Sequence, residues 1–449
     1  MSTRFRRPEP GPPAPVRFPS IVRHTLDNGL AVWTIPYGAL PVATTTLVIG
    51  RGTAEDPPDR HGLASLTGDL LDEGAGRLDA IELADAFARA GTHLNIDTGP
   101  DATTLSCAGL SRVLDRILDL MADVVIRPRL GEEDFERVRE LRINRLRQLS
   151  RSAGSMADRA WVTAVFRDHP YGHGAMGTTA ALSAMSVDDA RTHWQRHLAP
   201  SVATLIVVGD VQPDDVTTAA ERAFGAWSVT PDEPVAAPAS TAPDARILLV
   251  DRPGAAQSEL RVGHAAPPRS TPLYHSLVVA NAVLGGQFTS RINQRLREEM
   301  GITYGAHTSF DFRRLAGSFS CDTSVQTDAT ADAVREILAQ FDAIRGAAVD
   351  ADELDAARAS LTRGYVRNFE TAGQISRAAV QLVTYDLPDD TFDRFVPVVG
   401  SVTSDDVQRA AREVIDPAKA TVVVVGNAED CRASLEQIGR PIEAVTPEF

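Results

Sequence analysis

Short runs of alternating apolar and polar residues open the chain, and a longer run with helical spacing follows them. Two alternating runs within residues 24–36 flank an Asp-Asn-Gly sequence at 27–29, which is typical of a tight hairpin turn. Residues 42–50 are apolar and β-branched and predict another strand. Across residues 60–76 leucines recur at helical spacing, which predicts a helix with one buried face.

The order of predicted elements in the first half returns in the second half. The strand around Leu205 corresponds to the one around Val422, and the helix around Val113 corresponds to the one around Val334. Both offsets are about 220 residues, which is the size of a domain. We therefore interpret the chain as an internal duplication. The elements that support this are predicted helices at 112–125, 132–149, 332–344 and 352–369 and predicted strands at 203–211, 246–251 and 420–430.

Each half combines antiparallel hairpins with helices that are segregated from them, which indicates an α+β fold. We expect two homologous domains, each a mainly antiparallel sheet packed with helices. The predicted boundaries give a mobile, proline-rich tail at residues 1–20, an N-terminal domain at 21–230, a linker at 231–245 and a C-terminal domain at 246–440.

The net charge of the chain is -15 at pH 7 and its isoelectric point is near 5.2. Nucleic-acid binding needs clustered Lys and Arg that acids do not balance, so we expect no nucleic-acid partner. Cys107, Cys321 and Cys431 are odd in number and far apart, which is typical of a reducing compartment and not of a disulfide framework. No apolar run reaches signal-peptide or transmembrane length, so we expect a cytoplasmic protein without a membrane partner.

Residues 284–304, LGGQFTSRINQRLREEMGITY, join two glycines, an amphipathic helix and the start of a strand. The glycines should let the backbone approach a ligand closely. Gly301 ends the predicted helix, and the residues after it predict a strand that begins near Tyr304. Arg297 and Tyr304 would then lie on two rigid elements that meet at one corner. Taken alone, Arg297 could equally be one of several solvated helix charges, and Tyr304 a strand aromatic.

Five histidines could be metal ligands, and a structural role is favoured for each. His193 and His197 lie four apart on a predicted helix, as metal ligands often do, but no acidic residue lies between them. His169 and His173 flank a loop, where local hydrogen bonds that hold a turn are the simpler interpretation. His61 precedes a helix and is interpreted as a residue of the capping region or of the surface.

Ordered markers along nearly the whole chain resemble the M16 metallopeptidases, the family of pitrilysin, insulin-degrading enzyme and the mitochondrial processing peptidase, in its two-chain bacterial branch. The resemblance spans residues 21 to 440. Its markers in the first half are LDNGL, HGLASLTGDLLDEG, AGTHLNIDT, HPYGHGAMGT and LIVVGDV, and in the second half the stretch 284–304 and the closing VVVVG. The resemblance implies the fold of that family and a role in peptide-bond hydrolysis.

The zinc motif of that family is missing from this chain. The family carries His-x-x-Glu-His on a helix and a further glutamate ligand downstream. Here Ser65 and Asp69 stand at the two histidine positions, Gly68 stands at the general base, and Asn144 or a neighbour stands where the downstream ligand belongs. We therefore expect no metal in this chain and a zinc ion in a partner subunit.

The resemblance also implies roles for three other residues. Arg297 and Tyr304 match a family Arg and Tyr that reach the scissile region of the substrate, where they would hold the peptide carbonyl and stabilise the oxyanion. Asn95 matches a family asparagine beside an edge strand that can pair with substrate backbone.

The sequence therefore predicts the non-zinc-binding subunit of a heterodimeric M16-type metalloendopeptidase, inactive alone. Its expected partners are a catalytic subunit with an intact zinc motif and unfolded or short peptide substrates. The alternative is a non-catalytic structural or assembly protein with the same fold, which fold alone does not exclude. A third reading is an autonomous hydrolase that uses another metal cluster.

Overall fold

The computed structural model describes residues 11–236 and 245–449. The first half of the expected tail at 1–20 and most of the expected linker at 231–245 lie outside the described residues. Among the described residues, no helix is both long and apolar enough to cross a membrane.

The first half of the chain forms a six-stranded sheet with the order β1-β2-β8-β3-β7-β6. Its pairs are antiparallel except for β2 and β8. The predicted hairpin turn joins β1 and β2, and Gly29 adopts the positive φ of +89° that such a turn needs. The strands are β1 (Val22–Thr25), β2 (Ala31–Pro36), β3 (Val42–Ile49), β6 (Asn95–Thr98), β7 (Thr103–Leu110) and β8 (Ala203–Gly209).

The second half repeats this sheet with the order β11-β12-β10-β13-β9-β14. Read from the other edge, β9, β13, β10, β12 and β11 take the places of β2, β8, β3, β7 and β6, which confirms the duplication and the α+β fold. The strands are β9 (Ile247–Asp251), β10 (Gln257–Ala266), β11 (Thr303–Phe312), β12 (Gly317–Gln326), β13 (Thr421–Gly426) and β14 (Ile442–Ala444).

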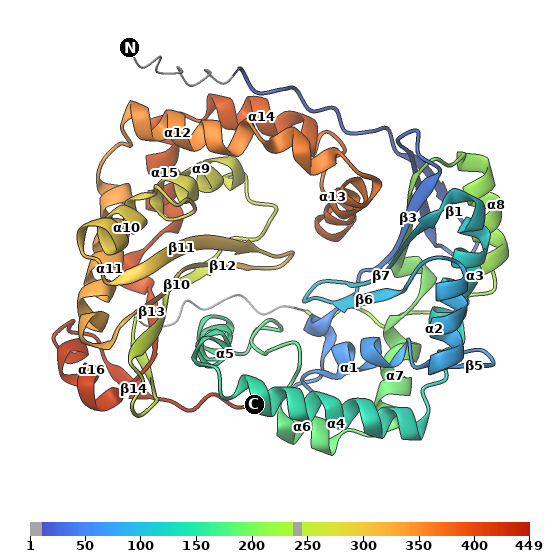
Figure 1. Ribbon diagram of the computed structural model, residues 1–449, viewed down its shortest axis with the longest axis horizontal. Coiled ribbons are helices and arrows are strands. Elements are labelled where there is room, and N and C mark those ends of the chain that lie inside the picture. Colours follow the sequence, from blue (N-terminus) through green and yellow to red (C-terminus); the bar gives the residue numbers. More distant parts are fainter. Residues whose placement is uncertain (1–10, 237–244) are drawn as a thin grey trace, which may run out of the picture.

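Helices cover both sheets (Figure 1). In the first half they are α1 (Leu63–Leu70), α2 (Ala80–Arg89), α3 (Leu114–Ile126), α4 (Glu132–Leu149), α5 (Ala153–Phe166), α6 (Thr179–Ala184), α7 (Val187–His197) and α8 (Pro213–Phe224). In the second half they are α9 (Tyr274–Leu284), α10 (Arg291–Asn293), α11 (Thr330–Gly346), α12 (Ala351–Thr362), α13 (Ala372–Tyr385), α14 (Thr391–Ser401), α15 (Ser404–Val414) and α16 (Ala428–Glu436).

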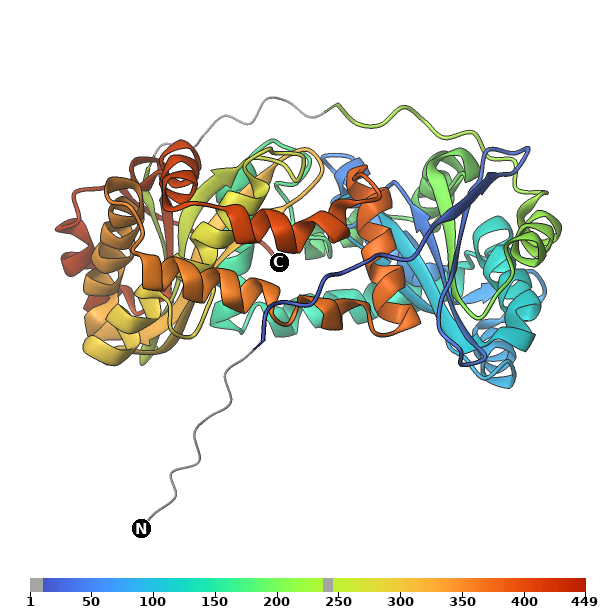
Figure 2. The same ribbon diagram turned by 90° about the horizontal axis from the view of Figure 1, so that it is seen from above.

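The two halves exchange one helix each. Helix α5 of the first half packs on β10 and β13 of the second sheet, and α13 of the second half packs on β3 and β8 of the first (Figures 1 and 2). Trp161 and Val165 of α5 share a core with Val423 of β13. Because the second face of each sheet is covered by the other half, every residue of β8 and β13 is buried, and these strands are continuous apolar runs.

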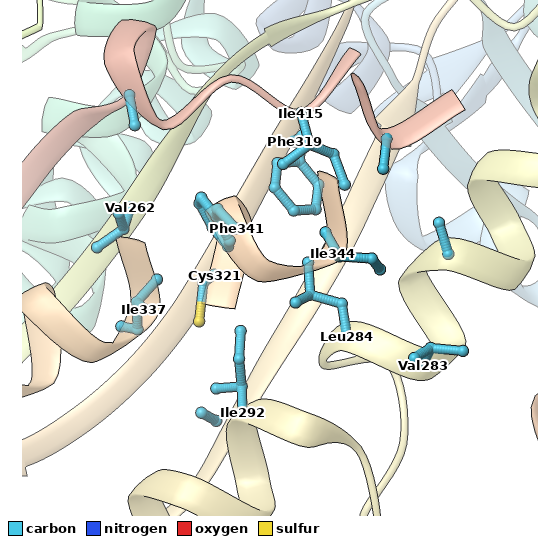
Figure 3. Close-up of a cluster of buried hydrophobic side chains, with 14 of the residues drawn as sticks. Val262, Val283, Leu284, Ile292, Phe319, Cys321, Ile337, Phe341, Ile344 and Ile415 are labelled. Atoms are coloured by element: carbon cyan, nitrogen blue, oxygen red, sulfur yellow. The ribbon is translucent and has the colours of Figure 1, made fainter. Parts of the chain in front are cut away.

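The core of the second half lies between its sheet and helices α9 and α11 (Figure 3). Phe319 of β12 and Phe341 of α11 meet there with ring centroids 5.0 Å apart. Cys321 lies in the same core, where burial raises the pKa of its thiol. Cys107 and Cys431 are buried as well. All three cysteines therefore serve as small apolar core residues.

Residues 11–20, the described part of the expected tail, form no helix or strand. Val16 is buried, and the ring of Phe18 lies 5.9 Å from that of Phe369 and 5.1 Å from that of Phe392. The backbone N–H of Phe18 donates to the carboxylate of Asp393 at 2.6 Å. The segment around Phe18 is thereby attached to the second half, before β1 enters the first sheet.

Candidate functional site

Helix α1 carries Ser65 and Asp69, the positions at which the family has its zinc-binding histidines. The helix begins at a tightly packed corner. The Asp56 carboxylate accepts hydrogen bonds from the backbone N–H groups of Gly62 (2.6 Å) and Ala64 (2.7 Å). Burial raises the pKa of Asp56 to about 7. Gly62 has a φ of +97°, and a Cβ there would lie 2.7 Å from the backbone N of Gly177, so the corner requires glycine.

A guanidinium group lies between the two positions at which the family has its histidines. Arg142 of α4 is 7% exposed and donates to Ser65 Oγ and to the carboxylate of Asp69. Ser65 Oγ in turn donates to the carbonyl of Ala175 at 2.7 Å. One long side chain thus ties α1, α4 and the 172–178 loop together.

This arrangement does not fit a zinc ion. A neutral hydroxyl and one carboxylate replace two imidazoles, and the positive guanidinium between them would repel a divalent cation. A Cβ at Gly68 would lie 2.6 Å from Thr98 Oγ1 on β6, so a glutamate base has no room without movement of the edge strand. Within residues 11–236 and 245–449 no group of three or more His, Cys, Asp and Glu side chains is placed to hold a metal.

The residue that faces α1 from α4 is Arg142 and not Asn144. Asn144 is exposed, and its side-chain oxygen accepts from Arg147 at 3.0 Å. A sequence signal for Arg142 exists, because Val138, Arg142 and Leu146 follow at helical spacing and all three are buried. A charge in the middle of an apolar stripe needs a partner inside the protein.

The stretch 284–304 forms the predicted corner between a helix and β11, and most of the helix is π-helical. After the short α10, residues Gln294–Glu299 form a π-helical turn, and Gly301 ends it with a φ of +66°. Such turns are rare and are frequent at functional sites. The predicted strand start is confirmed, since β11 begins at Thr303.

The buried amide of Asn293 holds this corner. Its Nδ2 donates to the carbonyls of Gln287 (3.0 Å) and Ala306 (2.6 Å), and its Oδ1 accepts from the N–H of Ala306 at 2.9 Å. The loop, the helix and β11 are thereby joined. The preceding glycines serve packing: a Cβ at Gly285 would lie 2.5 Å from Thr308, and one at Gly286 would lie 2.6 Å from Asn281.

Arg297 and Tyr304 come together at this corner, and Phe288 joins them. The Arg297 guanidinium lies 3.8 Å from the centroid of the Phe288 ring and 5.7 Å from that of Tyr304. Phe288, in the loop before α10, is 66% exposed. Tyr304 is 92% exposed, and a bulge between Thr303 and Ala306 interrupts the pairing of β11 there. Sequence reasoning missed Phe288, which looks like a loop residue.

The Arg297 guanidinium is partly buried, with its side chain 26% exposed. Among the described residues its nearest carboxylate belongs to Glu298, 3.7 Å from Nη1, and Nη1 is buried without a hydrogen-bond partner. Aromatic rings hold a cation without using its N–H groups, which lie in the guanidinium plane. The corner therefore presents an oriented positive charge and a phenol to a ligand.

Asn95 lies on a different sheet. It is the first residue of β6, is exposed, and pairs with Ser106 of β7. Strand β6 is the edge of the first sheet and contacts α1, whereas β11 is the edge of the second sheet (Figure 1). The structure thus brings Arg297 and Tyr304 together and places Asn95 on the edge strand that contacts α1.

The histidine pairs have structural surroundings. The rings of His61 and His173 stack 4.0 Å apart, and His173 Nε2 lies 3.1 Å from the carbonyl of Thr53. The rings of His193 and His197 lie 4.5 Å apart. Burial, together with the neighbouring His197, lowers the pKa of His193 to about 3.

His193 makes stability sensitive to acid. Its pKa is about 6.5 in an unfolded chain and about 3 in the fold, so its contribution is complete above pH 6.5 and is lost as the pH falls toward 3. The free energy of unfolding should fall by roughly 2 kcal/mol at pH 5 from this group alone. We expect His193→Leu to lose correspondingly less stability than the wild type between pH 7.5 and pH 5 in urea titrations. The exposed His24, changed to Gln, is the control, and equal acid losses in wild type and His193→Leu would contradict the assignment.

The sequence was compared with known families and proteins. Residues 39–179 match the family described as insulinase (peptidase family M16), and residues 184–361 match the one described as peptidase M16 inactive domain. A protein of Mycobacterium tuberculosis named an uncharacterized zinc protease is 25% identical over 413 residues, which cover 91% of this chain and 93% of that protein. A protein of Streptomyces coelicolor with the same description is 22% identical over 421 residues, 92% and 91% of the two chains.

Solved structures share the fold at low identity. A peptidase M16 inactive domain from Pseudomonas fluorescens superposes with a TM-score of 0.85 at 21% identity, over 91% of this chain and 98% of that one. A protease from Helicobacter pylori gives 0.83 at 18% identity, over 91% and 100%. A chain of complex III2 from Candida albicans gives 0.77 at 13% identity, over 93% and 100%.

Proposed function

Since this chain is a member of the peptidase M16 family, we propose that it is the non-zinc-binding subunit of a heterodimeric metalloendopeptidase. The observation that carries the proposal is that Arg142 donates hydrogen bonds to Ser65 and Asp69. A positively charged side chain of this protein therefore lies at the position where the family binds its zinc ion. A chain built in this way needs a partner with an intact His-x-x-Glu-His helix, and that partner would hold the zinc ion.

The corner of Arg297 and Tyr304 is this chain's contribution to the shared site. A zinc ion held by the partner's His-x-x-Glu-His helix would activate water for attack on a peptide carbonyl, and negative charge would develop on the carbonyl oxygen. A guanidinium and a phenol that are already oriented can donate to that oxygen without reorganising. The exposure of Tyr304 and the buried Nη1 of Arg297, which has no hydrogen-bond partner among the described residues, favour this role over a purely structural one.

The proposed substrates are unfolded or short peptides, because an extended backbone is what a pair of donors and an edge strand recognise. Asn95, at the start of the edge strand β6, is the proposed additional contact. We propose a cytoplasmic location, in keeping with three unpaired, buried cysteines, and neither a nucleic acid nor a membrane as a partner.

The second candidate function is a non-catalytic structural or assembly role. This chain superposes on a chain of complex III2, and one fold can serve either a structural or a catalytic role. At 13% identity that likeness concerns the fold alone. An assembly protein needs neither a buried guanidinium nitrogen that lacks a hydrogen-bond partner nor a phenol that is 92% exposed.

Reconstitution tests the proposal. The tagged chain is purified from its own cells, bound proteins are identified, and peptidase activity is measured for each chain alone and for the pair, together with the zinc content of each. We expect a partner with the intact motif, zinc in that partner, and activity only in the pair. Activity of this chain alone, or a pair that shows no activity, would refute it.

Phe288 should matter for the proposed site through Arg297. Phe288→Ala removes the ring that stacks on the guanidinium, a contact worth about 0.5–1 kcal/mol, so we expect the rate of the pair to fall about two- to fivefold. Phe288→Tyr should restore the rate because the ring remains. Thermal melting should not change, since the side chain is largely exposed. A Phe288→Ala pair with the wild-type rate would show that the stacking does not position Arg297.

A further inference from the structure

A cavity of about 370 Å³ lies between α9, α13, α14 and the 3-10 helix at Tyr365–Phe369. No residue of the Arg297 corner or of α1 lines it, so it is separate from the proposed peptidase site. Its volume is within the range of small-molecule sites, which is about 300 to 1,000 Å³. All of these helices belong to the second half, and α13 also packs on the first sheet.

Two arginines of this cavity have no acidic partner. Within the described residues, neither Arg269 nor Arg377 has a carboxylate within 4.0 Å, and neither guanidinium donates a hydrogen bond to the protein. The nearby acids contact other groups: the Asp393 carboxylate accepts from the backbone N–H of Phe18 and keeps its charge, and Asp390 lies 3.7 Å from Arg394. Two guanidinium groups without a contacting carboxylate in one cavity are unexpected in a chain with a net charge of -15.

The surroundings orient one of these charges. The Arg269 guanidinium lies 3.5 Å from the centroid of the Tyr274 ring, and this stacking fixes its plane while leaving its N–H edge free. Burial, with Arg269 and Arg394 nearby, lowers the pKa of His275 in the cavity wall, so His275 adds no charge of its own.

Aromatic rings form the apolar part of the wall. The rings of Tyr365 and Phe395 stack 4.1 Å apart, and those of Phe369 and Phe392 lie 5.4 Å apart. A ligand that matches this cavity needs an anionic group for the arginines and a flat or branched apolar group for the rings.

We propose that this cavity binds a carboxylate attached to an aromatic or branched apolar group, the chemistry found at the C-terminal residue of an apolar peptide. The carboxylate accepts from Arg269 and Arg377, and the apolar group packs on Tyr365 and Phe395. The side-chain amide of Gln381 lies in the same wall and can bond to a neighbouring amide of the ligand. A bound ligand touches both α9 and α13 and so strengthens the contact between the two halves.

Calorimetric titration of the full chain tests this without any peptidase partner. The probes are N-acetylphenylalanine, its C-terminal amide and inorganic phosphate. We expect saturable 1:1 binding of the acid and at least tenfold weaker binding of both the amide and phosphate. Arg377→Gln should weaken the acid at least tenfold without affecting folding, because the side chain is exposed, and Arg269→Gln should act in the same direction. Arg89→Gln on α2, 79% exposed, is the matched control and should bind like the wild type.

Three results would overturn the proposal. One is the absence of saturable binding of N-acetylphenylalanine at millimolar concentration. Another is equal affinity for the acid and the amide, or for the acid and phosphate, which would mean that the carboxylate or the apolar group is not recognised. The third is unchanged binding by Arg377→Gln, which would place the ligand elsewhere. Each of these leaves the proposed peptidase role untouched, since that role depends on the Arg297 corner.

Discussion

Replacing Arg142 with alanine should lower the free energy of unfolding by about 2–3 kcal/mol. The guanidinium is buried and donates to Ser65 and Asp69 on α1, so its removal opens a cavity between α1 and α4 and leaves the Ser65 hydroxyl with one bond fewer. The expected loss lies below the roughly 3–5 kcal/mol of a broken, fully buried pair because the Asp69 side chain is 51% exposed and water can solvate it.

Two further variants make this prediction specific. Arg142→Lys should recover only a small part of the loss, because an ammonium on a flexible stem cannot donate to a hydroxyl and a carboxylate in the planar geometry of a guanidinium. Arg145→Ala makes the same chemical change on the exposed face of α4 and should cost less than about 0.5 kcal/mol. Urea titration followed by circular dichroism measures all three. If Arg142→Ala were as stable as Arg145→Ala, the bridge would not hold α1 to α4.

The sequence predicts the local elements well because their signals are local. The Asp-Asn-Gly turn, the alternating strands and the leucine spacing of α1 each act within a few residues, and all of them form. The prediction of one helix over 352–369 is wrong after Thr362, where Gly364 lies between α12 and a 3-10 helix. Glycine disfavours continued helix, and its position was visible in the sequence.

The exchange of α5 and α13 could not be predicted in the same way. The unbroken apolar runs of β8 and β13 show that both faces of each sheet are covered, but they do not show which half supplies the second layer. That choice depends on contacts between residues far apart in sequence, such as those of Trp161 with the second sheet.

Only part of the candidate site could be predicted from the sequence. The loss of zinc ligands at Ser65 and Asp69 is evident from the residues, yet the residue that replaces the metal is found only when α4 is placed against α1. In the same way Arg297 and Tyr304 were predicted from the sequence, whereas the hydrogen bonds from Asn293 to the backbone of Ala306 were not. An amide in a polar run carries no signal that it is buried and bonded to a strand.

Replacing Arg297 with alanine should reduce kcat of the active pair on the order of a hundredfold, which is the usual cost of losing one donor to a developing oxyanion. KM should change much less, because the donor acts on charge that exists mainly in the transition state. Tyr304→Phe tests the phenol separately, since it keeps the ring beside Arg297 and removes only the hydroxyl. Because Tyr304 is exposed, Tyr304→Phe should leave the folding of this chain and the assembly of the pair unchanged.

The neighbouring Arg295 is the matched control for Arg297. It lies on the same π-helical turn, but its guanidinium is paired with Glu336 at 2.9 Å and with Glu299. Arg295→Ala removes an equal charge from the same turn and should leave kcat within about twofold, since surface ion pairs contribute little. If Arg295→Ala and Arg297→Ala reduced kcat equally, the effect would be one of general surface charge. If neither did, the corner of Arg297 and Tyr304 would have no part in the reaction, and the assembly role would be the better account of this chain.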